Sequence, residues 1–289
     1  MLSPVPAGQI DVPNPLGKPG STPLPMWEAP PAARPGGPNV IIIPGPPDLA
    51  KARAGDVDAQ VRLGISFATA KPPNFAEALK WFSEASNKGS ATGAMNVGQM
   101  HEIGLGVAKD STEAVKWFRL AAERGFASAQ ARLGQHYENG FGVPQNYAEA
   151  LKWYRAAADQ KNAIGQNGLG ALYERGRGVP TDQVEATRLF RLAADQGQAL
   201  AQANLGLQYL AGRGTGQSAR AGYFWLNLAA ARLPAGTTPL RDQVARARDA
   251  AAAKLAPSEV ESMQQMAAAW KPGSADVPAD LPLGPTVAK

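Results

Sequence analysis

A spacing of 36 residues recurs through the middle of this chain and constrains its fold more than any other feature. Glycines that follow Leu or Val are 34, 36, 36 and 36 residues apart: Gly64, Gly98, Gly134, Gly170 and Gly206. An aromatic series keeps the same register: Phe67, His101, Tyr137, Tyr173 and Tyr209. A third series keeps it as well: Trp81, Trp117, Trp153, Leu189 and Trp225. Three series in one register predict five copies of one supersecondary unit.

Each copy is predicted to contain two helices. Small and apolar residues at helical spacing predict a first helix from about Ser90 to Ile103. A Gly-x-Gly turn that begins at Gly104 ends this helix. The second helix begins where an N-cap residue precedes a glutamate by three positions, which is a capping signal. These N-cap residues are Asn74, Asp110, Asn146 and Asp182, and Ser218 caps the fifth copy without the glutamate.

The recurring glycine lies within the first helix, where glycine is about 1 kcal/mol less favourable than alanine. We expect the second helix to approach the bare backbone there, with the Trp and the aromatic residue packed over the glycine. On this interpretation Gly98→Ala overpacks the contact and Trp117→Ala leaves a cavity. One copy cannot bury both of its faces alone, so stacked copies are expected to share a continuous core as a solenoid.

These residues resemble the Sel1-like repeat, a relative of the tetratricopeptide repeat. The pattern Leu-Gly-x₂-Tyr-Glu-x-Gly-x-Gly-Val from Leu133, followed by Trp-Tyr-x₂-Ala-Ala from Trp153, matches best, and the resemblance covers about residues 54 to 232. It implies an all-α fold, a right-handed α-solenoid of about five two-helix repeats with a C-terminal helical cap. It also implies a non-enzymatic scaffold for a protein or peptide partner, of a kind common in bacteria and often found in the cell envelope. The departures from the pattern are His101, Lys161, Leu189 and Thr215.

Four parts are predicted along the chain: a Pro-rich disordered arm over 1–47, the repeats over 48–232, capping helices over 233–271 and a disordered tail over 272–289. The arm holds 14 of the 25 Pro residues, which lack the backbone donor that helices need. Its apolar cluster at 40–43 either docks on the solenoid or belongs to a flexible spacer. A capping box at Ser258 and Glu261 is expected to open the last helix. The residues expected to cover the last repeat are Leu255, Val260, Met263, Met266 and Trp270.

Composition excludes several classes of site. The chain has no Cys and two His, which excludes a disulfide framework and a thiolate site, and no metal or other cofactor is expected. A net charge of +5 is too weak to indicate a nucleic-acid partner, and none is expected. No apolar run approaches the roughly 18 residues of a membrane helix, so no integral membrane segment is expected. The expected location is periplasmic or secreted if an upstream signal has been removed, and cytoplasmic otherwise.

One acidic row leaves a second function open. Glu102, Glu138 and Glu174 each follow the aromatic position of their copy. The row suits acid–base catalysis or a cationic ligand, but we favour a structural role, such as a bond to the following glycine turn. The glycine turns themselves lack the strand and third glycine of a dinucleotide-binding loop. The alternative function is a cell-envelope accessory protein or enzyme that binds or acts on glycans, suggested by this row and the Trp-rich repeats.

Partner binding is predicted at polar, outward-facing positions of the first helices, which line the inner face of tetratricopeptide-like solenoids. A polar row of this kind suits an extended peptide or a partner helix that is held by hydrogen bonds. The candidates are Thr92, Gln99, Glu102, Ser128, Gln135, Glu138, Asn139, Asn167, Glu174 and Arg175.

Overall fold

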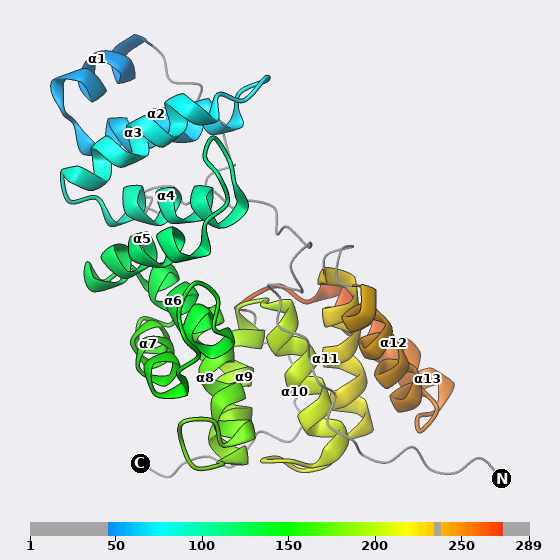
Figure 1. Cartoon of the computed structure of the whole chain (residues 1–289). Helices are drawn as coiled ribbons and strands as arrows, with labels where there is room; N and C mark the ends of the chain where they lie inside the picture. Colours follow the sequence, from blue (N-terminus) through cyan, green and yellow to red (C-terminus); the bar gives the residue numbers. More distant parts are fainter. Residues whose placement is uncertain (1–45, 234–237, 274–289) are drawn as a thin grey trace. The chain divides into compact units, whose positions relative to one another are not determined.

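Thirteen α-helices and no strands make up the part of the protein that its computed structural model describes, residues 46–233 and 238–273 (Figure 1). The prediction of an all-α fold built from two-helix repeats is confirmed. The described residues form two compact units, an N-terminal unit (46–160) and a C-terminal unit (161–273). The apolar cluster predicted at 40–43 and most of the predicted tail lie outside the described residues. The boundaries predicted for the four parts of the chain stay predictions.

The N-terminal unit contains one leading helix and three copies of the two-helix repeat. Its helices are α1 (Pro46–Ala54), α2 (Val57–Thr69), α3 (Phe75–Asn87), α4 (Ala91–Ile103), α5 (Ser111–Glu123), α6 (Ala127–Asn139) and α7 (Tyr147–Asp159). Helix α1 begins within the predicted arm, with a proline at a first-turn position that tolerates it. Its residues Leu49 and Ala52 pack with Leu63 and Trp81 in one apolar cluster.

The C-terminal unit contains two more copies and two final helices. These helices are α8 (Ala163–Arg175), α9 (Gln183–Asp195), α10 (Ala199–Ala211), α11 (Ala219–Arg232), α12 (Thr238–Ala252) and α13 (Pro257–Ala269). In both units the even-numbered helices α2 to α10 are the first helices of their copies, and the odd-numbered helices α3 to α11 are the second.

The predicted caps of the second helices are confirmed in all five copies. The side chain of each cap accepts a hydrogen bond from the backbone N–H three residues on. The backbone N–H of each cap donates in turn to the carbonyl of the aromatic series, as from Asp110 to His101 at 2.9 Å. Because that N–H is already bonded, the capping glutamates are free to pair elsewhere, and Glu113 and Glu185 form ion pairs with Lys116 and Arg188.

The recurring glycine lies against one residue of the second helix, and that residue is not the Trp. A Cβ atom added to Gly98 would lie 2.6 Å from Cε1 of Phe118. The atoms nearest to that Cβ belong to Phe118 and Ala114, whereas the prediction placed the Trp over the glycine as well. Trp117 is half-buried and packs against the apolar clusters of two neighbouring copies. The residues that face the glycine in the other copies are Phe82, Tyr154, Phe190 and Leu226.

The glycine turns fix the end of each first helix and the contact between copies. Gly104 takes the left-handed conformation that ends α4, with φ of 83°. The second glycine of a turn reaches the preceding copy, because a Cβ on Gly142 would collide with the backbone of Ser111 and Thr112. In the N-terminal unit, the C-cap residue of each second helix also binds the segment before its copy, which is the turn after α1 for Lys88 and the preceding copy for Arg124 and Gln160. Lys88 Nζ donates to the Gly55 carbonyl at 3.2 Å, Arg124 Nη1 to that of Ser90 at 3.1 Å and Gln160 Nε2 to that of Gly125 at 3.0 Å.

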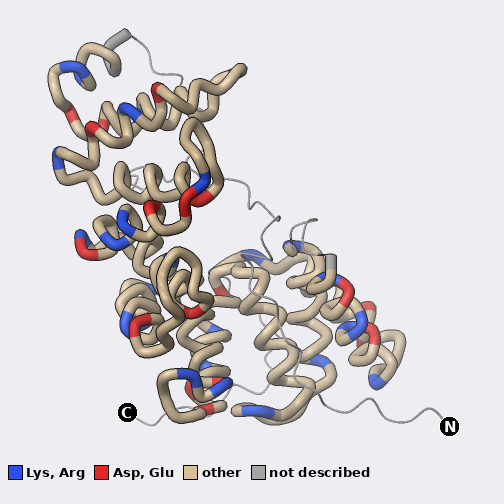
Figure 2. Tube along the Cα trace, viewed as in Figure 1, with Lys and Arg blue, Asp and Glu red and all other residues tan. Residues whose placement is uncertain are grey.

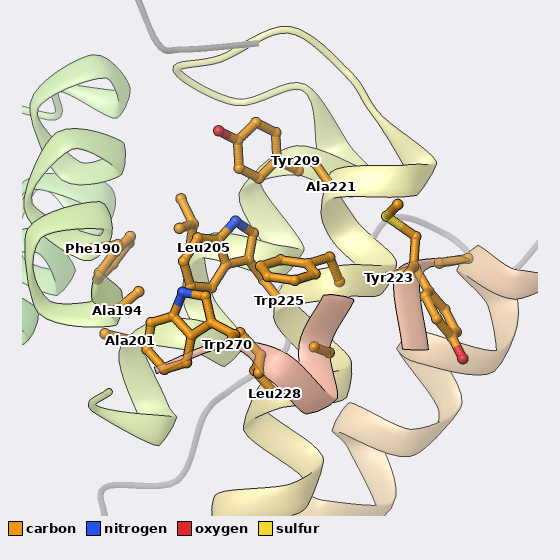
Figure 3. Close-up of a cluster of buried hydrophobic side chains, with 14 of the residues drawn as sticks. Phe190, Ala194, Ala201, Leu205, Tyr209, Ala221, Tyr223, Trp225, Leu228 and Trp270 are labelled. Atoms are coloured by element: carbon orange, nitrogen blue, oxygen red, sulfur yellow. The ribbon is translucent and has the colours of Figure 1, made fainter. Parts of the chain in front are cut away.

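Helix α13 covers the last repeat through Trp270 (Figure 3). The Trp270 ring meets the Trp225 ring edge-on, with centroids 6.1 Å apart, and only 4% of Trp270 is exposed. The predicted capping box at Ser258 and Glu261 is wrong by two residues. Pro257 occupies the first turn, and Glu259 accepts the backbone N–H of Ala256 at 2.9 Å. The other predicted covering residues pack in the same cluster: Leu255, Val260, Met263 and Met266.

Candidate functional site

The predicted partner-binding residues lie on three first helices. Helix α4 carries Thr92, Gln99 and Glu102, and helix α6 carries Ser128, Gln135, Glu138 and Asn139. Both helices belong to the N-terminal unit, whereas Asn167, Glu174 and Arg175 lie on α8 of the C-terminal unit. The candidates therefore form two sets, and each set has its own hydrogen-bond network.

The prediction that all ten candidates face outward does not hold. Thr92, Gln99, Gln135 and Asn167 are buried, with exposed fractions of 4–9%, and the other six are half-buried. Asn167 meets a polar residue of the next first helix, because Asn204 Nδ2 of α10 donates to its Oδ1 at 3.0 Å.

Glu102 joins α4 to α6 in the N-terminal unit. Its Oε1 lies 3.1 Å from Nε2 of the buried His136, and its Oε2 lies 3.7 Å from Nη1 of Arg132. Burial alone would raise the pKa of Glu102, but the hydrogen bond with His136 and the positive charges of Arg132 and Lys109 hold that pKa below its usual value. Glu102 is therefore an ionised link between two copies.

Glu174 occupies the equivalent position in the C-terminal unit, but its pKa is shifted in the opposite direction. Gln208 of α10 donates through Nε2 to Oε1 of Glu174 at 2.8 Å, so this link also joins consecutive first helices. Burial raises the pKa of Glu174, and the charges of Arg175 and Arg213 oppose that rise without cancelling it. The carboxylates of both residues thus bond the next first helix rather than the following glycine turn, which corrects our interpretation of the acidic row.

Glu138 bonds within its own copy. Its Oε2 accepts the hydroxyl of Tyr154 at 2.8 Å. That tyrosine ring covers Gly134, and burial raises the pKa of its hydroxyl well above the usual value. The neighbouring Asn139 donates through Nδ2 to the carbonyl of Gln135 at 2.7 Å. Glu138 therefore helps to fix the residue on which the contact between α6 and α7 depends.

Gln99 and Gln135 differ from the other candidates because their side-chain oxygens have no partner. The Oε1 atoms of both are buried and accept no hydrogen bond from the described residues. A buried acceptor without a partner costs about 1–3 kcal/mol. The two glutamines have the same register, one residue after the recurring glycine, in consecutive first helices. We call these two residues, with their unsatisfied side-chain oxygens, the glutamine pair.

Sequence reasoning missed half of each link between copies. Arg132, His136, Asn204 and Gln208 were not candidates, although each is the partner of one that was. A signal for them exists, because they lie two residues before or after the recurring glycine. A polar residue at those positions in one copy, with another polar residue about one period earlier, would have indicated a pair.

Charges of both signs are interspersed along the helices of each unit (Figure 2). Within the ranges described, no three His, Cys, Asp or Glu side chains gather where they could hold a metal ion. None of the described helices is both long enough and apolar enough to cross a membrane.

A family model described as the Sel1 repeat matches the chain five times, at residues 57–90, 91–126, 127–162, 163–198 and 199–232. Similar solved structures include the following two. One is a protective antigen of uropathogenic Escherichia coli strains that displays an SLR fold, with 27% identity and a TM-score of 0.65 over 76% of this chain and 47% of that one. This chain thus spans less than half the length of the antigen. The other is a Sel1 repeat protein from Oxalobacter formigenes, with 26% identity and a TM-score of 0.62 over 76% of this chain and 90% of that one. The search of curated proteins finds no match.

Proposed function

The chain belongs to the Sel1 repeat family, and on this premise we propose that it is a non-enzymatic scaffold that binds a protein or peptide partner through its first helices. Sel1 repeat proteins in general mediate protein–protein interactions. The observation that carries the proposal for this chain is the glutamine pair, Gln99 and Gln135, whose side-chain oxygens accept no hydrogen bond within the described part of the chain.

An amide side chain both donates and accepts hydrogen bonds, so it matches the N–H and C=O groups of a partner backbone. Two such amides in one register on consecutive helices suit an extended peptide that crosses α4 and α6. Because both oxygens are buried, the two side chains would have to turn outward on binding, and the partner would then satisfy two acceptors that have no partner among the described residues. The half-buried Ser128 and Asn139 lie on the same helix as Gln135 and are the proposed flanking contacts.

The test is a crosslinking pull-down from the native cell with three forms of the full chain: wild type, the double variant Gln99→Ala/Gln135→Ala, and Gln265→Ala. Gln265 is an exposed glutamine of α13 and serves as the matched control. We expect a protein that wild type and Gln265→Ala both capture to be lost from the double variant, with its thermal melting not lowered. Equal capture by all three forms would contradict the proposal.

The alternative, binding or hydrolysis of glycans, has weaker support from the contacts. Glu138 of the acidic row accepts the hydroxyl of the buried Tyr154. Trp81 and Trp225 are buried, which removes two rings that could stack on a sugar. A glycan pull-down and a hydrolase assay with a Glu138→Gln control separate the two functions. Activity or binding that depends on Glu138 would favour the alternative.

A further inference from the structure

His136 lies between two oxygen atoms on opposite sides of its ring. It is on α6, and only 1% of it is exposed. Its Nδ1 is 2.8 Å from the carbonyl oxygen of Phe141, and its Nε2 is 3.1 Å from Oε1 of Glu102. The Phe118 ring packs against it, with centroids 5.3 Å apart. The imidazole is thus enclosed by the second copy on one side and by its own glycine turn on the other.

Neither oxygen is able to donate a proton to the ring. A backbone carbonyl only accepts, and so does an ionised carboxylate. Glu102 is ionised because the Arg132 guanidinium Nη1 lies 3.7 Å from its Oε2, and the positive charges of Arg132 and Lys109 lower its pKa against the effect of burial. A neutral imidazole has one N–H and would therefore leave a lone pair facing one of the two oxygens. Both contacts are hydrogen bonds only if both ring nitrogens carry protons.

We propose that the folded protein holds His136 as an imidazolium ion and that this ion is a proton-dependent link between the first helices α4 and α6. The charged groups around it are Glu102 from α4, Arg132 from α6 and Lys109 from the turn after α4. Helix α5 contributes the apolar ring of Phe118. When the proton is lost, Glu102 keeps its ion pair with Arg132, so the link weakens while the carboxylate stays ionised.

The sign of the pH dependence follows from proton linkage. An unfolded histidine releases its proton near about pH 6.5. If the fold retains the proton above that pH, the folded state binds more protons than the unfolded state, and stability falls as pH rises. A pH dependence of partner binding would additionally rest on the proposed function, whereas the protonation state does not.

The direct test is the ring nitrogen spectrum of His136 by nuclear magnetic resonance. The chain has two histidines, so the full-length variant His101→Gln leaves His136 as the single signal. We expect both ring nitrogens to carry a proton at about pH 7. Adding Glu102→Gln offers an amide N–H to Nε2, and the ring should then lose its Nε2 proton. A single N–H in His101→Gln would overturn the proposal.

Urea unfolding at several pH values provides a second measurement. Between about pH 6 and about pH 8, the folding equilibrium constant of His101→Gln should fall at least about threefold more than that of His136→Gln. Equal pH dependence in the two variants would overturn the link even if both nitrogens are protonated. If His136→Gln fails to fold, the spectra of His101→Gln with and without Glu102→Gln still decide the question.

Discussion

Gly98 lies against the ring of Phe118, so that a Cβ atom added to Gly98 would be 2.6 Å from Cε1 of that ring. Real Cβ atoms do not approach so closely, and either the ring or the two helices would have to move. The same contact recurs between the first and second helix in every copy. It is the reason that a residue unfavourable within a helix defines the repeat.

Replacing Gly98 with alanine should therefore lower the free energy of unfolding by about 1–3 kcal/mol, because the contact becomes overpacked. Urea unfolding measures the change. In a Phe118→Ala background the ring is gone, and the same replacement should be much less destabilising. Additive effects of the two changes would show that the steric contact is not the cause.

Lys161 has φ of 61° and is the one non-glycine residue with positive φ in the described ranges. Gly89, Gly125 and Gly197 occupy the corresponding position in other copies. Lys161→Gly should raise the free energy of unfolding by about 1 kcal/mol, since it relieves backbone strain. Lys161→Ala keeps the strain, and a similar gain from that control would attribute the effect to the lost charge instead.

Gly142 and Gly125 both have positive φ, but their surroundings differ. A Cβ on Gly142 would collide with the backbone of Ser111, whereas a Cβ on Gly125 meets no atom within 4 Å. Gly125→Ala should lower the free energy of unfolding by about 1 kcal/mol, because it introduces backbone strain and no clash. Gly142→Ala should cost at least about 1 kcal/mol more, because two copies must separate. Thermal melting of both variants measures the difference, and equal costs would mean that the turn does not hold the copies together.

Glu102 and Glu174 should respond to acid in opposite directions. The pKa of Glu102 is lowered in the fold, so it stabilises the protein above its unfolded pKa, and this is lost as pH falls. The pKa of Glu174 is raised by burial, so the fold favours its protonated form and gains stability as pH falls. At neutral pH, Glu102→Gln should therefore lower the melting temperature and Glu174→Gln should raise it. Both differences should shrink toward about pH 4, and shifts of the same sign would contradict this assignment.

Trp270 and Trp117 should differ in their contribution to stability. Trp270 is buried against Trp225, and the guanidinium carbon of Arg232 lies 4.9 Å from its ring centroid. Trp270→Ala should cost roughly 3–5 kcal/mol because it leaves a cavity. Trp117 is half-buried, so Trp117→Ala should lower the free energy of unfolding by less than the replacement of a buried tryptophan does. Calorimetry of the two variants tests the order, and a larger effect at Trp117 would reverse it.

Features that depend on neighbouring residues along the chain could be predicted from the amino-acid sequence. The five copies, the ends of the helices and the caps at residues such as Asp110 are set by local spacing and by backbone donors within a few residues. The left-handed glycines at Gly104 and its equivalents follow from the same local chemistry. The residues that cover the last repeat were also predictable, because one helical face of α13 is apolar.

The contacts between side chains of different copies depend instead on how the helices pack. Spacing places Gln99 and Glu102 on one helix, but the rotation of that helix against the next one decides that Glu102 meets His136. It also decides that the Gln99 oxygen is buried with no partner among the residues that the structure describes, and that Phe118 rather than Trp117 lies nearest to Gly98. A rotation by one residue shifts a helical face by about 100°. The periodicity of a single sequence does not fix that rotation, because it results from the packing of whole helices.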